Sequence, residues 1–493
     1  MDMGGNKAST RIAILGAGMS GLGMVAKLKE AGYQAITLFE KSGGVGGTWR
    51  DNTYPGCGCD VPSHLYSYSF DLNPDWDYKW SLQPQILKYF EDFADKHDLR
   101  RHCRFNTEIT DCRWSDIDNV WTLTDQAGGQ HTADVLVSGL GQLNIPYTPD
   151  FPGKETFKGA AFHSARWDHS VDLKGKTVAV IGNGPSAVQF VPEIQKVAGK
   201  LLNFQRSPAW CRPRGQRTYT DADKRSFRRQ PWRINWYRWR IRAYADFGFG
   251  AFLMNSPMGL SNAMRKMCQD HLEDQVKDAG LRAKLQPDFD PGCKRILISD
   301  DYYPALCQPN VEVLRQGITE VTEDGVIGED GQAHPCDVII WATGFNATDF
   351  LTPMEVHGRN GLSLNEAWRD GAEAFKGVAV SGFPNFFLLY GPNTNLGHNS
   401  IILMVEHQIN YVIQCIDRIA GAKVAAIDVT PQAMEAYNVR VQSEIAKTVW
   451  AANCESWYKT DAGKITNNWY GRTTDYKKET AAPDWADFEV IDR

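Results

Sequence analysis

The 493-residue sequence has no excess of basic residues, which excludes one large class of function. It contains 53 Lys and Arg against 59 Asp and Glu, a formal net charge of −6. A general nucleic-acid-binding protein presents a positive surface, so nucleic acid is not expected as a partner. Apolar residues make up 42% and charged residues 23%, as in globular domains rather than disordered chains. At roughly 150 residues per domain, the length predicts two or three domains.

A secretory signal and long apolar runs are also lacking. The first ten residues are polar, and a strand is expected from Arg11. Two uncharged stretches, 247–264 and 377–405, are interrupted by Asn, Pro and Gly and do not resemble membrane spans. We therefore expect no transmembrane segment and a cytoplasmic location.

The 11 cysteines have neither metal-ligand spacing nor a disulfide pattern. Cys57 and Cys59 are too close together for a CxxC pair, and no His cluster accompanies them. The sequence predicts a reduced compartment, no disulfide framework and no metal site.

Strand-like and helix-like segments alternate along the chain, which is typical of an α/β protein. A buried strand, a glycine turn and an amphipathic helix occur at 11–32 and again at 176–197. The sequence therefore predicts two Rossmann-like dinucleotide-binding domains. A long helix is expected from about Ser400, after a polar loop.

The first glycine turn has the full context of a dinucleotide site. Gly16 permits the tight turn, Gly18 lets a pyrophosphate approach the backbone, and Gly21 lets the helix pack on the strand. Glu40 ends the next strand, 19 residues after Gly21. A carboxylate there binds ribose hydroxyls and repels a 2′-phosphate, so this turn suits FAD or NAD rather than NADP.

The second turn has the opposite charge preference. Gly182, Gly184 and Ala187 occupy the three glycine positions, and Arg206 stands 19 residues after Ala187. A guanidinium can bind a 2′-phosphate through two hydrogen bonds, so NADPH is predicted. FAD and NADPH in one chain imply hydride transfer from NADPH to a flavin.

These motifs set the expected domain boundaries. Residues 1–145 are predicted to form the first part of the FAD-binding domain, followed by a linker at 146–170. The NADPH-binding domain follows at 171–372, with a helical insertion at about 215–290. Residues 373–493 return to the FAD-binding domain, and the tail after 470 is expected at the surface.

Two longer patterns identify a family. Residues 157–168 read FKGAAFHSARWD, and 46–60 read GGTWRDNTYPGCGCD. Together with both glycine turns, they resemble class B flavin monooxygenases, and within these the type I Baeyer–Villiger monooxygenases, over about residues 10–470. The first pattern ends in Trp167-Asp168, which the related heteroatom-oxidising enzymes lack. The residues that match this fingerprint are Phe157, Gly159, His163, Trp167 and Asp168.

The resemblance implies an FAD-dependent enzyme that consumes NADPH and O2 and converts a ketone to an ester or lactone through a C4a-peroxyflavin. Arg295 corresponds to the arginine that stabilises the peroxide and the later oxyanion, and Asp60 to its partner near the flavin. Lys294 would join Arg206 and Ser207 at the 2′-phosphate. The fingerprint residues are expected to couple domain movement to cofactor handling rather than to perform chemistry.

Other positions carry over from the family with less weight. Residues expected beside the FAD are Ser20, Thr48, Trp49, Tyr66 and Ile109. Residues expected beside the NADP are Ser186, Gln189 and Trp457.

Two other functions remain open from the sequence. One is a monooxygenase for sulfides or amines, against which the Trp167-Asp168 ending argues. The other is a non-catalytic nucleotide sensor, against which Lys294, Arg295 and Asp60 argue.

The segment RRQPWRINWYRWRIR places Trp232, Trp236 and Trp239 on one helical face. Such a face can bind a membrane surface or nucleic acid, but this spacing more often reflects packing. We interpret it as part of the helical insertion, packed beside the substrate entrance, with weak membrane association left open.

Overall fold

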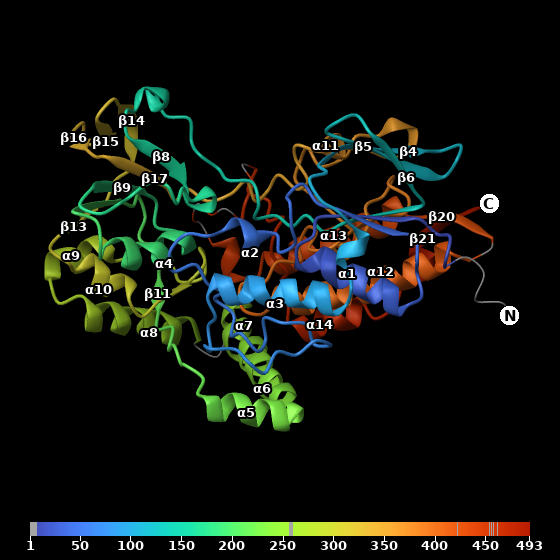
Figure 1. The fold of residues 1–493 in the computed structure, drawn as a ribbon, viewed down its shortest axis with the longest axis horizontal. Helices are drawn as coiled ribbons and strands as arrows, with labels where there is room; N and C mark the ends of the chain where they lie inside the picture. The colour runs from blue at the N-terminus through green and yellow to red at the C-terminus, as the bar shows by residue number, and fades with distance from the viewer. Residues whose placement is uncertain are drawn as a thin grey trace.

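A computed structural model describes residues 7–255, 260–421, 423–452, 454, 456, 458–460 and 462–493 (Figure 1). Two five-stranded parallel sheets form the centres of two lobes. The predicted α/β class with two Rossmann-type domains is confirmed.

The first sheet has the order β19-β7-β1-β2-β3, and every pairing in it is parallel. Its strands are β1 (Ile12–Leu15), β2 (Ile36–Phe39), β3 (Cys103–Arg104), β7 (Val135–Ser138) and β19 (Phe386–Leu388). Helix α1 (Met19–Glu30) follows β1 and packs against α12 (Ile401–Ile419). Strand β19 thus comes from the C-terminal third of the chain, and α12 begins after Ser400 as predicted.

The second sheet has the order β13-β10-β9-β17-β8 and is also parallel. Its strands are β8 (Ala160–His163), β9 (Thr177–Ile181), β10 (Lys200–Phe204), β13 (Val311–Leu314) and β17 (Val338–Trp341). Helix α4 (Pro185–Ile194) follows β9 and contacts α10 (Tyr302–Leu306). Because β8 pairs with β17, part of the expected linker at 146–170 is an edge strand of this sheet.

Two smaller antiparallel groups accompany the main sheets. One is the meander of β14 (Ile318–Thr322), β15 (Gly325–Gly328) and β16 (Ala333–Pro335). The other joins β4 (Ile109–Ser115), β5 (Val120–Asp125) and β6 (Gln130–Ala133) to β18 (Glu355–His357), which pairs in parallel with β4. The chain therefore rejoins the first lobe by about residue 355, earlier than the expected boundary at 372.

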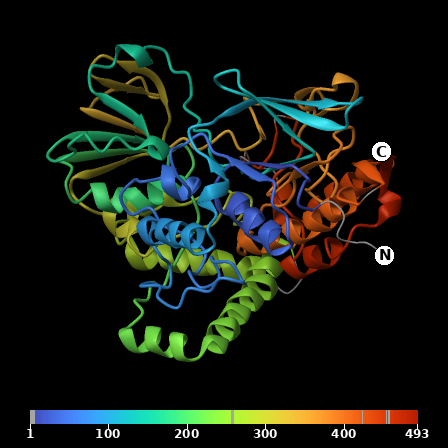
Figure 2. The same cartoon turned by 45° about the vertical axis from the view of Figure 1, so that its right-hand side comes forward.

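The insertion is helical, as expected, and its first two helices project from the body (Figure 2). It contains α5 (Asp221–Arg229), α6 (Pro231–Tyr244), a π-helical turn (Ala245–Phe249), α7 (Gly250–Leu253), α8 (Leu260–Gln275) and α9 (Ala279–Leu285). The expectation that the tryptophan face of α6 is packed is wrong: Trp232, Trp236 and Trp239 are 52–64% exposed. The buried face is the opposite one, which carries Ile234 and Arg238.

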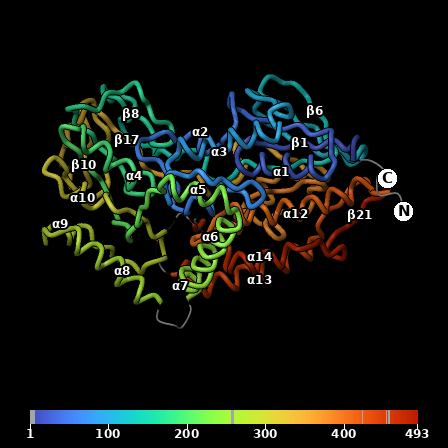
Figure 3. The backbone as a smooth tube through the Cα atoms, turned by 60° about the horizontal axis from the view of Figure 1, so that its bottom comes forward, coloured from blue at the N-terminus to red at the C-terminus, as the bar shows by residue number. Residues whose placement is uncertain are grey.

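The expectation of a surface tail after residue 470 is also wrong. Helix α14 (Thr473–Glu479) packs on α12 (Figure 3). Its Tyr476 is fully buried. Strand β21 (Phe488–Asp492) pairs with β20 (Val424–Val429), and α13 (Pro431–Ile445) lies between β20 and α14 in the chain. The C-terminal segment is therefore an integral part of the first lobe.

Candidate active site and nucleotide sites

The first glycine turn brings β1 and α1 into close contact. Gly16 has φ +90°, in the region that favours glycine. A Cβ on Gly21 would lie 2.0 Å from the carbonyl oxygen of Gly16, so only glycine lets the helix sit this close to the turn. Gly18 is the N-cap of α1, which directs the free N–H groups of the first helical turn toward any group bound there.

Glu40 lies just beyond β2 and beside this turn. Its carboxylate is buried and accepts hydrogen bonds from the N–H of Ala17 at 2.7 Å and of Ser42 at 2.8 Å. These contacts hold the carboxylate at the edge of the turn. A carboxylate has more acceptor sites than these two bonds use, so it can also accept from ribose hydroxyls.

One large cavity opens at the carboxyl edge of the first sheet. Arg295 reaches it from the second lobe and lines it together with residues of the first. Nine of the ten residues predicted to contact FAD line this cavity: Gly16, Gly18, Ser20, Glu40, Thr48, Trp49, Asp60, Tyr66 and Ile109. The tenth, Gly21, lies behind the turn and permits the helix packing described above.

Arg295 and Asp60 form an ion pair in this cavity although 235 residues separate them. Both side chains are partly exposed to the cavity, at 23% and 33%. Attraction to the Asp60 carboxylate raises the pKa of the Arg295 guanidinium, so this cation stays charged at every working pH. The Arg295 guanidinium is thus a permanent cation at the junction of the two lobes, paired there with a carboxylate.

Three polar side chains that the sequence did not single out surround this pair. Tyr390 lines the cavity and donates a hydrogen bond to Asn395 at 2.8 Å, and burial raises the pKa of Tyr390 to about 12. Tyr458 is close enough to Arg295 to interact with its charge, and burial raises its pKa to about 12. The polar loop between β19 and α12 was the only signal in the sequence that could have pointed to Tyr390 and Asn395.

The cavity wall is stiffened by aromatic contacts. The indole N–H of Trp49 donates to the Tyr66 hydroxyl at 3.1 Å, and the two rings meet edge to face at 5.6 Å. Trp49 comes from the short helix α2 (Thr48–Asp51), which α3 (Gln83–Lys96) supports. Two predicted residues therefore hold each other in place.

The second glycine turn leaves open space beside its backbone. Gly182 has φ +111°, and a Cβ there would lie 2.5 Å from the Ala342 carbonyl oxygen. Gly184 is the N-cap of α4, and no atom lies within 4 Å of the position that a Cβ would take on it. Ala187 is fully buried at the packing position, and Ser186 lies in the first turn of α4. The open space above Gly184 is where a pyrophosphate would approach the backbone.

A basic cluster stands at the carboxyl end of β10. Arg206 is exposed there, and the stem of its side chain passes Gly317. The ammonium of Lys294 donates to the hydroxyl of Ser207 at 3.1 Å and lies 4.9 Å from the ring centre of Phe289. Lys294 therefore contacts Ser207, which follows Arg206 in the chain, and the binding of a 2′-phosphate by these three residues stays a prediction.

Gln189 lies on the face of α4 that contacts the first lobe. Its amide oxygen accepts from the Tyr54 hydroxyl at 3.0 Å and from the Gly58 N–H at 3.1 Å, and its amide N–H donates to the Gly58 carbonyl at 3.0 Å. The structure therefore assigns this side chain a contact between lobes, while its contact with NADP stays a prediction.

Of the fingerprint residues, Trp167 reaches the contact between the two lobes, and Phe157 and Gly159 pack within the second lobe. Trp167 packs on Phe190 of α4 at 5.3 Å, and Phe190 in turn meets Tyr54 of the first lobe at 6.0 Å. Phe157 packs against the core of the second lobe, and a Cβ on Gly159 would lie 2.3 Å from the Asp337 carbonyl oxygen.

The two remaining fingerprint residues have structural surroundings as well. Burial lowers the pKa of His163 to about 4, and its neutral ring accepts from the Ala165 N–H at 3.0 Å. Asp168 accepts from the Ser170 hydroxyl at 2.6 Å and is exposed. Neither residue lines the cavity that holds Arg295.

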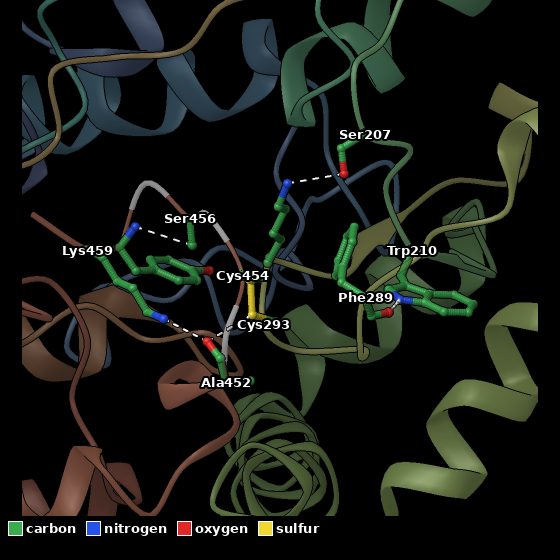
Figure 4. Close-up of a disulfide and its surroundings, with 10 residues drawn as sticks. Ser207, Trp210, Phe289, Cys293, Ala452, Cys454, Ser456 and Lys459 are labelled. Atoms are coloured by element: carbon green, nitrogen blue, oxygen red, sulfur yellow. Dashed lines mark hydrogen bonds between the residues drawn. A yellow bond between two sulfur atoms is a disulfide. The ribbon is translucent and has the colours of Figure 1, made fainter. Parts of the chain in front are cut away.

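A disulfide joins Cys293 to Cys454, so the prediction of a chain without disulfides is corrected (Figure 4). Cys293 directly precedes Lys294 and Arg295, and Ala452 and Lys459 belong to the C-terminal segment on the other side of the bond. The two cysteines are 161 positions apart, which is why no local spacing revealed them. Trp457, predicted beside the NADP, lies outside the described residues.

Metal ligands and membrane spans are both missing from the described part of the chain. Within the ranges given above, no group of three or more His, Cys, Asp or Glu side chains is arranged so that it could hold a metal ion. In the same ranges, each helix is too short or too polar to cross a bilayer.

Comparison with known proteins gives the family. Residues 9–223 match the family model described as flavin-binding monooxygenase-like. A Baeyer–Villiger monooxygenase of Streptomyces coelicolor is 41% identical over 98% of this chain and 92% of its own. One from Pseudomonas aeruginosa is 41% identical over 95% and 89%. The crystal structure of cyclohexanone monooxygenase from Rhodococcus bound to NADP+ superposes with a TM-score of 0.87 at 29% identity, over 98% of this chain and 99% of that one. The chain belongs to the Baeyer–Villiger monooxygenases of the flavin-binding monooxygenase family.

Proposed function

We propose that this protein oxidises ketones to esters or lactones, using FAD bound in the cavity of the first lobe, NADPH bound at the second glycine turn, and O2. The observation that carries the proposal is the Arg295–Asp60 pair, contributed by opposite lobes and exposed to one cavity. When FAD is bound, it supplies the redox chemistry, and NADPH and O2 are the other reactants.

The described residues fit both nucleotides. The glycine turn, the N-terminus of α1 and the Glu40 carboxylate are suited to a pyrophosphate and a ribose without a 2′-phosphate. Arg206, Ser207 and Lys294 supply two cations and a hydroxyl for a 2′-phosphate. The two sites therefore differ in charge preference.

The role of Arg295 follows from its charge and position. Oxygen insertion next to a carbonyl passes through negatively charged oxygen species, which a fixed cation stabilises best where water is excluded. Arginine cannot give up its proton at neutral pH, so it stabilises the anion without protonating it. Asp60 orients the guanidinium and compensates its charge before an anion forms.

The proposed partners are a small-molecule ketone and O2, and a cytoplasmic location suits an enzyme that consumes NADPH. The Cys293–Cys454 disulfide argues against a reducing compartment, because disulfides are rare there.

The test is product analysis of Arg295→Ala. We expect NADPH still to reduce the flavin, whereas ester formation falls by roughly 10²–10³-fold, as for loss of one oxyanion-stabilising group. Mass spectrometry of reactions with cyclic, linear and aryl ketones measures the ester, and stopped-flow absorbance measures flavin reduction. Arg315→Ala, which removes an exposed arginine paired with Asp288, is the control.

Two outcomes would contradict the proposal. Full ester production by Arg295→Ala would remove the role of this arginine. A thioether converted to sulfoxide, with no ester from any ketone, would place the protein among the heteroatom monooxygenases instead.

A further inference from the structure

The insertion presents an uncovered aromatic face, here called the α6 face. It consists of Trp232, Trp236, Trp239, Tyr244 and Phe247, which are 64%, 52%, 56%, 70% and 59% exposed. Monomeric proteins rarely expose large aromatic side chains in one contiguous group. Helices α5 and α6 project from the lower edge of the molecule (Figures 1 and 2).

The charged residues of the segment that carries the α6 tryptophans are all basic. No Asp or Glu stands between Lys224 and Ala245, whereas the whole chain has a net charge of −6. The guanidinium of Arg240 lies 4.8 Å from the ring centre of Trp236. Five basic side chains of this segment are exposed: Arg225, Arg228, Arg229, Arg233 and Arg240. Of these, Arg228 is paired with Asp75 of the first lobe, and the less exposed Lys224 is paired with Asp77.

The inner side of α6 is fixed to the body, so the exposed face is not a loosely attached segment. Arg238 is buried and donates to the carbonyl oxygens of His64 and Ser67 and to the Ser67 hydroxyl. In the turn after α6, buried Asp246 accepts hydrogen bonds from Asn399 at 2.8 Å and from the Thr473 hydroxyl at 2.7 Å. The helix is therefore held rigidly with its tryptophans outward.

We infer that the α6 face binds the surface of an anionic lipid membrane. Indole and phenol rings have an apolar body and a polar edge, which suits the interface between headgroups and acyl chains. Arginines beside them attract anionic headgroups while the rest of the acidic chain is repelled. The protein would lie on the membrane through this face, since no described helix spans it.

A second copy of the chain fits the α6 face less well. A two-fold interface through this face would bring Arg233 and Arg240 of one copy against the same arginines of the other. A folded acidic partner would need a groove for a convex helix, whereas a lipid surface adapts to it. This inference does not depend on the proposed catalytic function.

The test is co-sedimentation of the full-length holoenzyme with phosphatidylcholine vesicles, with and without about 30% phosphatidylglycerol. We expect binding to the anionic vesicles at about 0.05 M NaCl and its loss at about 0.5 M, where charges are screened over a few ångströms. Vesicles of phosphatidylcholine alone should bind at least tenfold more weakly.

Two exposed variants separate the aromatic and the basic contributions. Arg233→Gln with Arg240→Gln should weaken binding about 30-fold, which is about fivefold for each arginine near an anionic surface. Trp232→Ser, Trp236→Ser and Trp239→Ser combined should weaken it at least tenfold even in low salt. Ile117→Ser, which removes a 92% exposed apolar side chain from the turn between β4 and β5, should bind like the wild type.

Three results would overturn the inference. The first is no binding of the wild type to anionic vesicles at low salt. The second is equal binding by the wild type, the tryptophan variant and the arginine variant. The third is self-association in sedimentation velocity that the tryptophan substitutions abolish, without vesicle binding, which would show that a second copy covers the face.

Discussion

At the scale of single residues, two nucleotide preferences depend on one charge each. Glu40 directly follows β2 and Arg206 stands two residues after β10; one is a buried carboxylate held by the Ala17 and Ser42 N–H groups and the other an exposed guanidinium. A carboxylate repels a 2′-phosphate, and a guanidinium attracts it. We therefore predict that these two charges set the nucleotide specificity of each lobe.

We predict that Arg206→Ala weakens NADPH binding by roughly 10–100-fold and leaves NADH binding almost unchanged. A charge-assisted hydrogen bond contributes about 1.5–3 kcal/mol, and only NADPH has the phosphate that receives it. The KM for each nucleotide in steady-state oxidation measures the effect. Lys200→Ala removes a cation from the opposite end of the same strand and should change neither KM. Equal losses for NADPH and NADH would refute the assignment.

At the scale of elements, the two glycines of the second turn have separate tasks. Gly182 has φ +111° and no room for a Cβ beside the Ala342 carbonyl, whereas Gly184 has φ −70° and open space around its Cβ position. The first glycine is needed to fold the turn. The fold does not require the second, and we predict that it is needed where a pyrophosphate approaches the backbone.

We therefore expect Gly184→Ala to fold with wild-type stability, within about 0.5 kcal/mol, but to raise the KM for NADPH at least tenfold. Gly182→Ala should instead lower the free energy of unfolding by about 1–3 kcal/mol because of backbone strain. Thermal unfolding and NADPH kinetics on both variants distinguish the two roles. An unchanged KM in Gly184→Ala would place the pyrophosphate elsewhere.

The disulfide connects the loop before Arg295 with the C-terminal segment. Closing a loop across 161 positions restricts the unfolded chain, which typically stabilises a protein by about 2–4 kcal/mol. We predict this loss in Cys454→Ser and also in the reduced wild type, measured by urea unfolding. Cys307→Ser, at an exposed free cysteine, is the matched control. If reductant leaves the wild type unchanged, the bond does not contribute to stability.

At the scale of the whole molecule, buried titratable groups determine how stability responds to pH. Burial lowers the pKa of His64, His163 and His407 to about 4 each. These rings bind protons near pH 6.5 when the chain is unfolded. Their stabilising effect is therefore complete above pH 6.5 and is lost as the pH falls toward 4. Asp428 acts in the opposite direction, since burial raises its pKa to about 7 and favours the folded state at lower pH.

Between pH 6 and 5, the unfolded chain binds about two more protons than the folded one through these four groups, which corresponds to a loss of about 2–3 kcal/mol per pH unit. We predict a falling thermal midpoint over this range. Asp428→Asn should steepen the fall, because it removes the opposing group, and His407→Gln should make it shallower. A midpoint that rises from pH 6 to 5 would contradict the assignment of these histidines as buried and neutral.

The sequence by itself determined the features whose physical cause is local. Glycine turns, the strands before them and the charge that ends each second strand depend on a few neighbouring residues, so Gly16, Glu40, Gly182 and Arg206 were found without a structure. The same holds for α12, whose start after Ser400 follows from its own pattern.

Only the tertiary structure decided what depends on distant parts of the chain. The family resemblance had implied that Asp60 is the partner of Arg295, and the structure has this pair. The approach of Tyr390 and Tyr458 to the pair and the Cys293–Cys454 bond join segments that no spacing relates. The α6 face is the clearest example of a feature that the sequence alone does not determine. Helical periodicity placed the tryptophans on one side, but which side of a helix the body covers is settled by packing, and here it covers Ile234 and Arg238 instead.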